Sequence, residues 1–290
     1  MKPFLSILLP TFNRASMTIE AVKSVGDNPE VEIVVVDDCS DDIERARLAN
    51  GFDWNHGAKL FYNNTNLGMT RNFNRCMELA QGDWFGLIGS DDYYRLGSID
   101  RVVQALHRLP PCLMVYARSN TARILPPGHE TVRNMQLPSG SGNFWHRLIY
   151  EDLGGFDERL TFSPDAEYWY RIAEKYPVAE SPEKFSVYRE HGNNLMYDTW
   201  RQRDEFLKQI KLITRLNMVH RGEDTDDLDA VAASEMKSIW DTITYILRIT
   251  AGKPDKHDIF DMYIGKGASM ANTKERADAI NQLKRVRMKK

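Results

Sequence analysis

The chain has 290 residues, 42% hydrophobic and 27% charged, an ordinary balance for a soluble globular protein. Its length allows one large domain, or one of about 200 residues with an appended region. The net charge of -3 gives no electrostatic case for binding nucleic acid or an anionic membrane surface. Three well-separated cysteines lack metal or redox spacing, and no run approaches transmembrane length. We therefore expect a cytoplasmic protein, with peripheral membrane association as the alternative.

Two β–α units open the chain. Residues 4–9 are apolar and predict a strand that ends at Pro10, and a helix is expected from Ala15 or Ser16 to the Gly26–Pro29 turn. Residues 31–36 are nearly all β-branched, as in a strand covered on both faces, and they end in an acidic run, 37–42. This order predicts a doubly wound, mostly parallel α/β sheet.

The middle of the chain continues the alternation of strands and helices. A polar, Pro/Gly/Ser-rich segment, Arg118 to Gly142, is expected to be a mobile loop over the site. Pro164 favours the first turn of a helix running to about Lys175. Further strands are predicted at 59–62, 84–88, 113–117 and 185–188, and further helices at 69–81 and 98–109.

Composition shifts near Asp198, and from there the chain looks purely helical. Phe206, Ile210, Ile213 and Leu216 form an apolar stripe on the first of these helices. Such a stripe needs a partner surface. We therefore predict two regions, a catalytic domain over 1–197 and a helical C-terminal region over 198–290. The helices are expected to pack on the domain or form a homodimer, and to help shape the acceptor site.

Two adjacent acids, Asp91 and Asp92, directly follow the predicted strand at 84–88. In open α/β sheets ligands bind beyond the carboxyl ends of the strands. Two carboxylates there form a hard oxygen site that suits Mg2+ or Mn2+ carrying a substrate's phosphates. The alternative is an ordinary turn, since Ser-Asp-Asp is also good turn chemistry.

Arg71 falls in the first turn of the helix predicted at 69–81. A helix N-terminus carries a partial positive charge, so a cation is disfavoured there. An arginine at this position is better explained when an anion binds beside it. A solvated surface arginine is the alternative.

Four motifs occur in one order: Ser6-Ile-Leu-Leu-Pro-Thr-Phe-Asn-Arg14, Val34-Val-Val-Asp-Asp-Cys-Ser-Asp41, Asn66-Leu-Gly-Met-Thr-Arg-Asn72 and Gly82-Asp-Trp-Phe-Gly-Leu-Ile-Gly-Ser-Asp-Asp92. Leu153-Gly-Gly-Phe-Asp-Glu158 and Tyr188-Arg-Glu-His191 follow. Together they resemble the family 2 inverting glycosyltransferases of the GT-A fold, over about residues 3 to 195. The resemblance implies a metal-dependent transfer of sugar from a nucleotide-sugar, with UDP-sugars favoured, to an acceptor hydroxyl.

The resemblance also implies roles by position. The nucleotide-sugar would be bound by Pro10, Thr11, Phe12, Asn13, Arg14, Asp37, Asp38, Asn66, Gly68, Arg71 and Asp91. Among these, Asp37 would accept a hydrogen bond from uracil, Arg71 would face uracil or phosphate, and Asp91 would touch the ribose. Asp92 and His191 would hold Mn2+ or Mg2+. An ordinary loop histidine is the alternative for His191.

Asp165 stands where the family carries its general base, and Glu167 is the rival. Residues two apart on a helix point to different sides, so only one can face the acceptor. Two departures bear on the site. Gly89 replaces an acid that many members carry, and Pro164 replaces the glutamate that usually precedes the base. The first weakens the expected metal site, and the second leaves the identity of the base open.

The acceptor is the least defined partner. A surface glycan, lipopolysaccharide or glycolipid intermediate is the favoured acceptor class. A modified nucleic-acid base is a less favoured alternative, suggested by the basic and aromatic residues near Trp200. A catalytically inert sugar-nucleotide or glycan-binding module is a further alternative. A nucleotidyltransferase is disfavoured, because residues 10–14 contain no glycine.

Overall fold

Eight strands form the central sheet in the order β3-β2-β1-β4-β8-β6-β9-β7. The computed structural model describes residues 2–51, 57–110, 113–117, 122–135, 140–189, 203–226 and 228. The sheet strands are β1 (Leu5–Thr11), β2 (Val31–Asp37), β3 (Ala58–Tyr62), β4 (Trp84–Leu87), β6 (Met114–Ala117), β7 (Arg123–Leu125), β8 (Phe144–His146) and β9 (Val178–Ser181). A separate antiparallel pair joins β5 (Tyr93–Tyr94) to β10 (Ser186–Val187).

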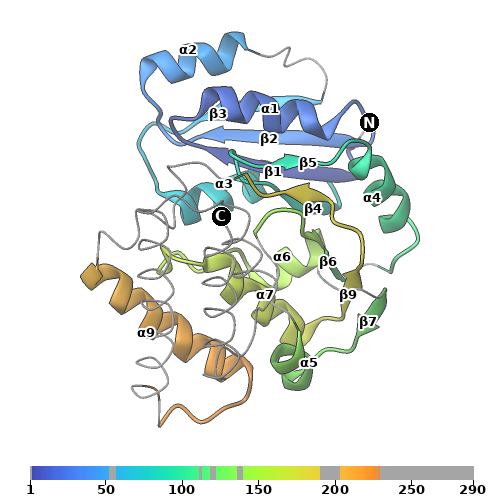
Figure 1. Ribbon diagram of the computed structural model, residues 1–290, viewed down its shortest axis with the longest axis vertical. Helices are drawn as coiled ribbons and strands as arrows, with labels where there is room; N and C mark the ends of the chain where they lie inside the picture. The colour runs from blue at the N-terminus through green and yellow to red at the C-terminus, as the bar shows by residue number, and fades with distance from the viewer. Residues whose placement is uncertain are drawn as a thin grey trace, which may run out of the picture. The chain divides into compact units, whose positions relative to one another are not determined.

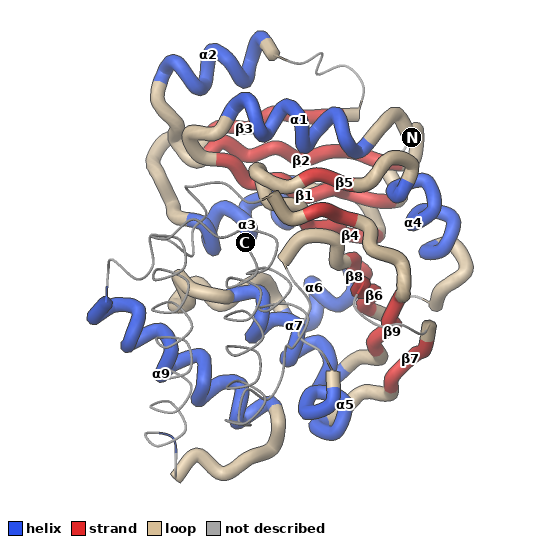
Figure 2. Tube along the Cα trace, viewed as in Figure 1, coloured by secondary structure: helices blue, strands red, loops and turns tan. Residues whose placement is uncertain are grey.

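The first four strands of this order, β3, β2, β1 and β4, run parallel. Figure 2 shows these strands side by side. Strand β8 then pairs antiparallel with both β4 and β6, while β6 and β9 are parallel. The predicted doubly wound, mostly parallel sheet is therefore confirmed. The helices of this unit are α1 (Ala15–Val25), α2 (Asp42–Asn50), α3 (Met69–Leu79), α4 (Ser98–Leu106), α5 (His129–Asn134), α6 (Arg147–Leu153), α7 (Pro164–Lys175) and α9 (Arg203–His220).

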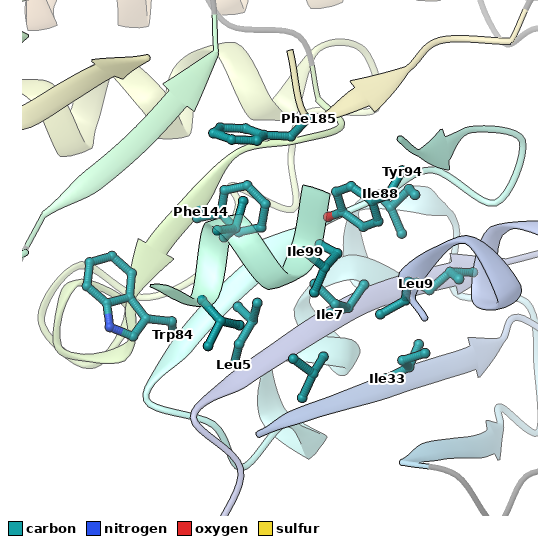
Figure 3. Close-up of a cluster of buried hydrophobic side chains, with 14 of the residues drawn as sticks. Leu5, Ile7, Leu9, Ile33, Trp84, Ile88, Tyr94, Ile99, Phe144 and Phe185 are labelled. Carbon is teal, nitrogen blue, oxygen red and sulfur yellow. The ribbon is translucent and has the colours of Figure 1, made fainter. Parts of the chain in front are cut away.

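Side chains alternate between the two faces of the sheet, because successive residues of a strand point to opposite sides. On one face Leu5, Ile7 and Leu9 of β1 pack with residues of α1 and α4 (Figure 3). On the other face Leu8 of β1 packs with residues of α3, α6 and α7. The central strands are thus covered on both faces, as the β-branched run of β2 predicted. This rigid core fixes the strand ends on which the candidate site is built.

The expected mobile loop over 118–142 is only partly a loop. Its described residues include strand β7 and helix α5. Arg123 of β7 pairs with the buried carboxylate of Glu180 on β9. Val132 of α5 and Met135, just after this helix, are buried in the core. The expectation failed here because the segment is polar in composition yet anchored by a few long-range contacts.

Helix α9 packs against α7 (Figure 1). Both helices belong to the same compact unit as the sheet, and this unit ends at Asp226. Ile213 of α9 joins Leu160 and Ala166 in a small apolar cluster. The Gln209 side chain accepts a hydrogen bond from Thr161 N (2.9 Å). The remainder of the predicted helical region lies outside the described residues, so its domain boundary, dimer and acceptor roles stay predictions. None of the described helices has the length and apolarity that crossing a bilayer requires.

Candidate active site

The predicted site residues gather where parallel strands end. Thr11, at the end of β1, lies in register with Asp37 at the end of β2, and Asp38 N donates to the Thr11 carbonyl (2.8 Å). Strand β4, on the other side of β1, leads into Asp91 and Asp92. Because the strands are parallel, their carboxyl ends meet at one edge of the sheet. The structure thus brings these three sequence motifs to a common edge.

The turn after β1 is locked to the loop after β2. Asn13 has a φ of 49°, a left-handed conformation that asparagine tolerates better than most residues. Its backbone N–H donates to Ser40 Oγ (2.7 Å). Pro10 and Thr11 are buried below this turn, whereas Phe12 is 44% exposed. The turn therefore offers one exposed aromatic ring at the edge of the site.

Asp37 is completely buried, and its carboxylate is hydrogen-bonded to neighbouring protein groups. Its Oδ2 accepts hydrogen bonds from Ser40 N (3.1 Å) and Arg45 Nε (3.0 Å), and the Ser40 hydroxyl donates to Oδ1. The guanidinium of Arg45 also donates to the Asn63 carbonyl (2.9 Å) and lies 5.2 Å from the centre of the Tyr62 ring. Asp37 is therefore already an anchor for the surrounding loops, and its contact with uracil stays a prediction.

Asp38 holds the loop before α3. Its carboxylate accepts hydrogen bonds from Leu67 N (2.8 Å), Gly68 N (2.9 Å) and Asn63 Nδ2 (2.9 Å). The Asn66 side chain donates to the Asp38 carbonyl (3.1 Å). Asp38 is only 2% exposed. The two residues of this loop that were predicted to bind nucleotide, Asn66 and Gly68, are thus placed by a buried acid.

Arg71 lies in the first turn of α3, as predicted, and it forms an ion pair with a protein carboxylate, Glu158. Its Nε lies 3.2 Å from Glu158 Oε2, and both side chains are at least half exposed. Exposed ion pairs contribute little to stability, so this pair costs little to open. The predicted role of Arg71 toward uracil or phosphate stays a prediction.

The two acids after β4 have different surroundings. Asp91 forms an ion pair with Arg14. Asp92 is 4% exposed, and its carboxylate accepts hydrogen bonds from the Ser141 hydroxyl and from Arg189 N (3.0 Å). Within the described part of the chain, no ion pair reaches Asp92. Burial raises the pKa of Asp92 to about 6; those hydrogen bonds and the positive charge of Arg189 oppose the rise, and the charge of Asp91 reinforces it.

Gly89, where the sequence departs from the family, lies close to both acids. A Cβ atom at this position would lie 2.9 Å from Asp91 Oδ1 and 3.3 Å from Asp92 Oδ2. An acid at position 89 would need both carboxylates to move. His191, the other predicted metal ligand, lies outside the described residues, and the described chain holds no group of three metal-ligating side chains.

The two candidate bases on α7 have different surroundings. Asp165 follows Pro164 at the helix start and is partly buried, and burial raises its pKa to about 6. Glu167 is 4% exposed and its carboxylate pairs with Arg171, at 2.9 Å, and with His220, at 3.3 Å. Burial acts to raise the pKa of Glu167, but these partners outweigh it and the pKa is lowered. Glu167 is committed to ion pairs, which favours Asp165 as the base.

Sequence reasoning missed three polar residues that organise this edge. Ser141 and the backbone of Arg189 bind Asp92, and Arg45 binds Asp37. Ser141 lies in a Gly/Ser run that was interpreted only as loop. Arg189 lies inside the Tyr188–His191 motif, so the motif could have indicated it. Arg45 sits on α2, which carries no family motif and gave no signal.

Comparisons with known proteins agree with this architecture. The family described as glycosyl transferase family 2 matches residues 6–156, more than half of the chain. A PGL/p-HBAD biosynthesis glycosyltransferase of Mycobacterium bovis (strain BCG / Pasteur 1173P2) is 32% identical over 118 residues, which are 39% of this chain and 46% of that protein. The matched region therefore spans less than half of that relative.

Two solved structures share the fold. S. aureus TarS 1-349 in complex with UDP-GlcNAc aligns with a TM-score of 0.59 at 18% identity, over 80% of this chain and 71% of that chain. The mannosyltransferase PcManGT from Pyrobaculum calidifontis, in complex with GDP-Man and Mn2+, aligns with a TM-score of 0.60 at 15% identity, over 98% and 85%. At such identities the likeness speaks for the fold alone, and it confirms the expected GT-A architecture.

Proposed function

Because the chain belongs to glycosyl transferase family 2, we propose that it moves a sugar from a UDP-sugar to an acceptor hydroxyl, with inversion at the anomeric carbon and with a divalent cation. The chain is a glycosyltransferase with the GT-A fold. The two aligned enzymes both hold a nucleotide-sugar, UDP-GlcNAc in TarS and GDP-Man with Mn2+ in PcManGT, and the choice of UDP rests on the resemblance of the sequence motifs. The proposed setting is the synthesis of a glycoconjugate, as for the mycobacterial relative.

One observation carries this proposal: two carboxylates, Asp92 and Asp165, both contact the turn formed by residues 140–142. Ser141 of that turn donates a hydrogen bond to Asp92, and Gly140 lies against Asp165, whose Oδ2 would be 3.3 Å from a Cβ on Gly140. A single displacement needs one charged group at the leaving diphosphate and one base at the acceptor. The contacts of the two acids with one turn support a division of these tasks between them.

The chemistry of Asp92 fits a divalent cation. It is a buried carboxylate that receives hydrogen bonds but no ion pair within the described residues, and such a charge favours a nearby cation. Mn2+ or Mg2+ would be held by Asp92, with His191 as the second proposed ligand, and with donor phosphate oxygens. When bound, the cation would supply Lewis-acid stabilisation of the charge that develops on the diphosphate.

The acceptor side needs a carboxylate that is ionised before reaction and holds a proton afterwards. Asp165, with its pKa raised to about 6, meets both needs near neutral pH. The acceptor oxygen bonds to the anomeric carbon as the bond to the diphosphate oxygen breaks, and the hydroxyl proton passes to the Asp165 carboxylate. Attack from the face opposite the leaving group inverts the anomeric centre, and no covalent intermediate is required.

The partners follow from this division of the site. The proposed donor is a UDP-sugar, and the proposed acceptor is a glycan or glycolipid hydroxyl. A nucleic-acid acceptor is not favoured, because the net charge of -3 provides no attraction for a polyanion.

Calorimetry with UDP and Mn2+ tests the donor site. Asp92→Asn keeps the size of the side chain but removes its charge, so Mn2+-dependent UDP binding should fall at least about 10-fold, as expected when a charged contact is lost. Asp27→Asn removes an exposed carboxylate outside the site and is the matched control. If Asp92→Asn binds UDP and Mn2+ as the unaltered chain does, Asp92 is not the cation ligand.

A further inference from the structure

The turn formed by residues 140–142 is held from several directions. Ser141 Oγ donates to Asp92 and accepts from Gly89 N (2.9 Å), while the Ser141 carbonyl accepts from Ser186 Oγ (3.0 Å). On the strand side, Gly142 N donates to the Leu87 carbonyl (2.9 Å). These bonds connect the turn to β4, to the acid pair and to β10. The turn is therefore fixed relative to Asp92.

The same turn also meets the candidate base. The only atom that a Cβ on Gly140 would approach within 4 Å, among those of the described chain, is Asp165 Oδ2, at 3.3 Å. The Gly140 carbonyl accepts a hydrogen bond from Asn143 Nδ2 (3.1 Å), which fixes this end of the turn. The absence of a side chain at Gly140 thus leaves the Asp165 carboxylate room at the site.

Ser141 contacts both Gly89 and Asp92. A side chain on Gly89 would crowd Asp91 and Asp92, whereas the Ser141 hydroxyl reaches Asp92 from another part of the chain. Its bond from Gly89 N leaves the hydroxyl proton directed at the Asp92 carboxylate. A hydroxyl that both accepts and donates has a defined orientation, so Ser141 restricts the rotation of Asp92.

We propose that the 140–142 turn positions both halves of the reaction, with Ser141 orienting Asp92 at the donor and Gly140 setting the clearance of Asp165 at the acceptor. This inference rests on the proposed function. Ser141 and Gly140 are positioning residues, since they act through the two carboxylates. Adjacent substitutions in one turn should therefore impair different steps.

Ser141→Ala tests the donor half. Calorimetry with UDP and Mn2+ should show about 10-fold weaker binding of UDP in the presence of Mn2+, the usual effect of losing a hydrogen bond to a charged group. Ser141→Thr retains the hydroxyl and should restore most of the affinity. Ser181→Ala removes a hydroxyl that accepts a local bond from Glu183 N (3.1 Å), and this variant should bind like the unaltered chain.

Gly140→Ala tests the acceptor half. The assay measures release of UDP from the UDP-sugar that the unaltered chain hydrolyses fastest. The added methyl group would press on Asp165. The rate should therefore fall about 10-fold or more, because small misplacements of a catalytic group are costly. The affinity of this variant for UDP with Mn2+ should change less than about 3-fold, since Asp92 keeps its partner. The pair of variants thus separates binding from turnover.

The outcomes distinguish this inference from the proposed function. An unaltered chain that binds no UDP with Mn2+ overturns the proposed function and the inference with it. If the unaltered chain binds and Ser141→Ala binds equally well, or Gly140→Ala keeps full turnover, the positioning role is overturned while the donor site stands. Equal losses of affinity in both variants would likewise show general damage to the turn instead of two separate tasks.

Discussion

His220 on α9 and Glu167 on α7 form an ion pair in which His220 Nε2 lies 3.3 Å from Glu167 Oε1. The other ring nitrogen, Nδ1, lies 2.7 Å from Glu174 Oε2. Glu167 also receives two hydrogen bonds of 2.9 Å from Arg171. This carboxylate therefore joins two helices, and its neighbour Asp165 is the acid of α7 that faces the 140–142 turn.

Asp165→Asn and Glu167→Gln should give opposite patterns of damage. Asp165→Asn removes the proposed base and should reduce turnover by about two to four orders of magnitude, with UDP affinity within a few-fold. Glu167→Gln should leave turnover nearly intact but lower the free energy of unfolding, by about 3 kcal/mol if the pair behaves as a buried one. Kinetics and urea unfolding of both variants check this. A dead Glu167→Gln enzyme beside an active Asp165→Asn enzyme would reverse the assignment.

The raised pKa of Asp165 predicts how rate and stability depend on pH. With a pKa of about 6, the base is ionised above pH 6, so kcat/KM should fall as the pH drops below that value. The folded state binds this proton more tightly than the unfolded chain, so the contribution of Asp165 to stability is present below about pH 4 and is lost as pH rises through 6.

Asp165→Asn should therefore be more stable than the unaltered chain at pH 8, by on the order of 1–2 kcal/mol. Melting temperatures at pH 4 and pH 8 check this, because the advantage should shrink at the lower pH. An Asp165→Asn variant that is less stable at pH 8 would mean that the ionised carboxylate is satisfied by partners and is a poor base.

His220 should make the packing of α9 dependent on pH. Burial acts to lower the pKa of His220, but Glu167 and Glu174 outweigh it and the pKa is raised. Its contribution to stability is thus fully present below the unfolded pKa of about 6.5 and is lost as pH rises through the folded value. His220→Gln should cost on the order of 1 kcal/mol at pH 5.5 and less at pH 8.5.

Urea unfolding at the two pH values measures this difference. The matched control is His107→Gln, because His107 pairs with Glu30 on the surface, where both side chains are about half exposed, and such pairs contribute little. A cost of His220→Gln that is the same at both pH values would show that the ring acts by packing and not by charge.

Asp37→Asn tests the predicted nucleotide base contact against the observed anchoring role. Loss of the charge leaves Arg45 without its buried partner, so stability should fall by about 1–3 kcal/mol. If Asp37 also contacts uracil, calorimetry should show that UDP binding weakens more than pyrophosphate binding. Arg45→Gln disturbs the same anchor without removing the carboxylate and is the control. Equal losses for both ligands in Asp37→Asn would limit Asp37 to anchoring.

The first half of the fold could be predicted from local sequence. Strand β2 is a β-branched run, and α1 follows Pro10 and ends before Gly26; such signals depend only on nearby residues. Strand β9 gave no comparable signal, because only two of its four residues are apolar. It forms because Val178 and Ala179 fill the core beside β6 and Glu180 pairs with Arg123.

In the candidate site, too, local features could be predicted from the sequence and long-range contacts could not. The acid pair was predictable because Asp91 and Asp92 come within five residues of the end of β4. Ser141 was not, since its bond to Asp92 spans 49 positions of sequence. Nor could spacing on α7 decide between Asp165 and Glu167, because the partner that commits Glu167, His220, lies 53 positions further along. Contacts of this range depend on the completed tertiary structure.

Asp38 has a consequence for the thermodynamics of donor binding. Its three hydrogen bonds to residues 63–68 order that loop in the free protein, so the conformational entropy of the loop is lost during folding and not at the moment a nucleotide binds. A preorganised wall lets more of the contact energy appear as affinity. If Asn66 and Gly68 bind the nucleotide as predicted, donor binding should therefore require little rearrangement of this loop.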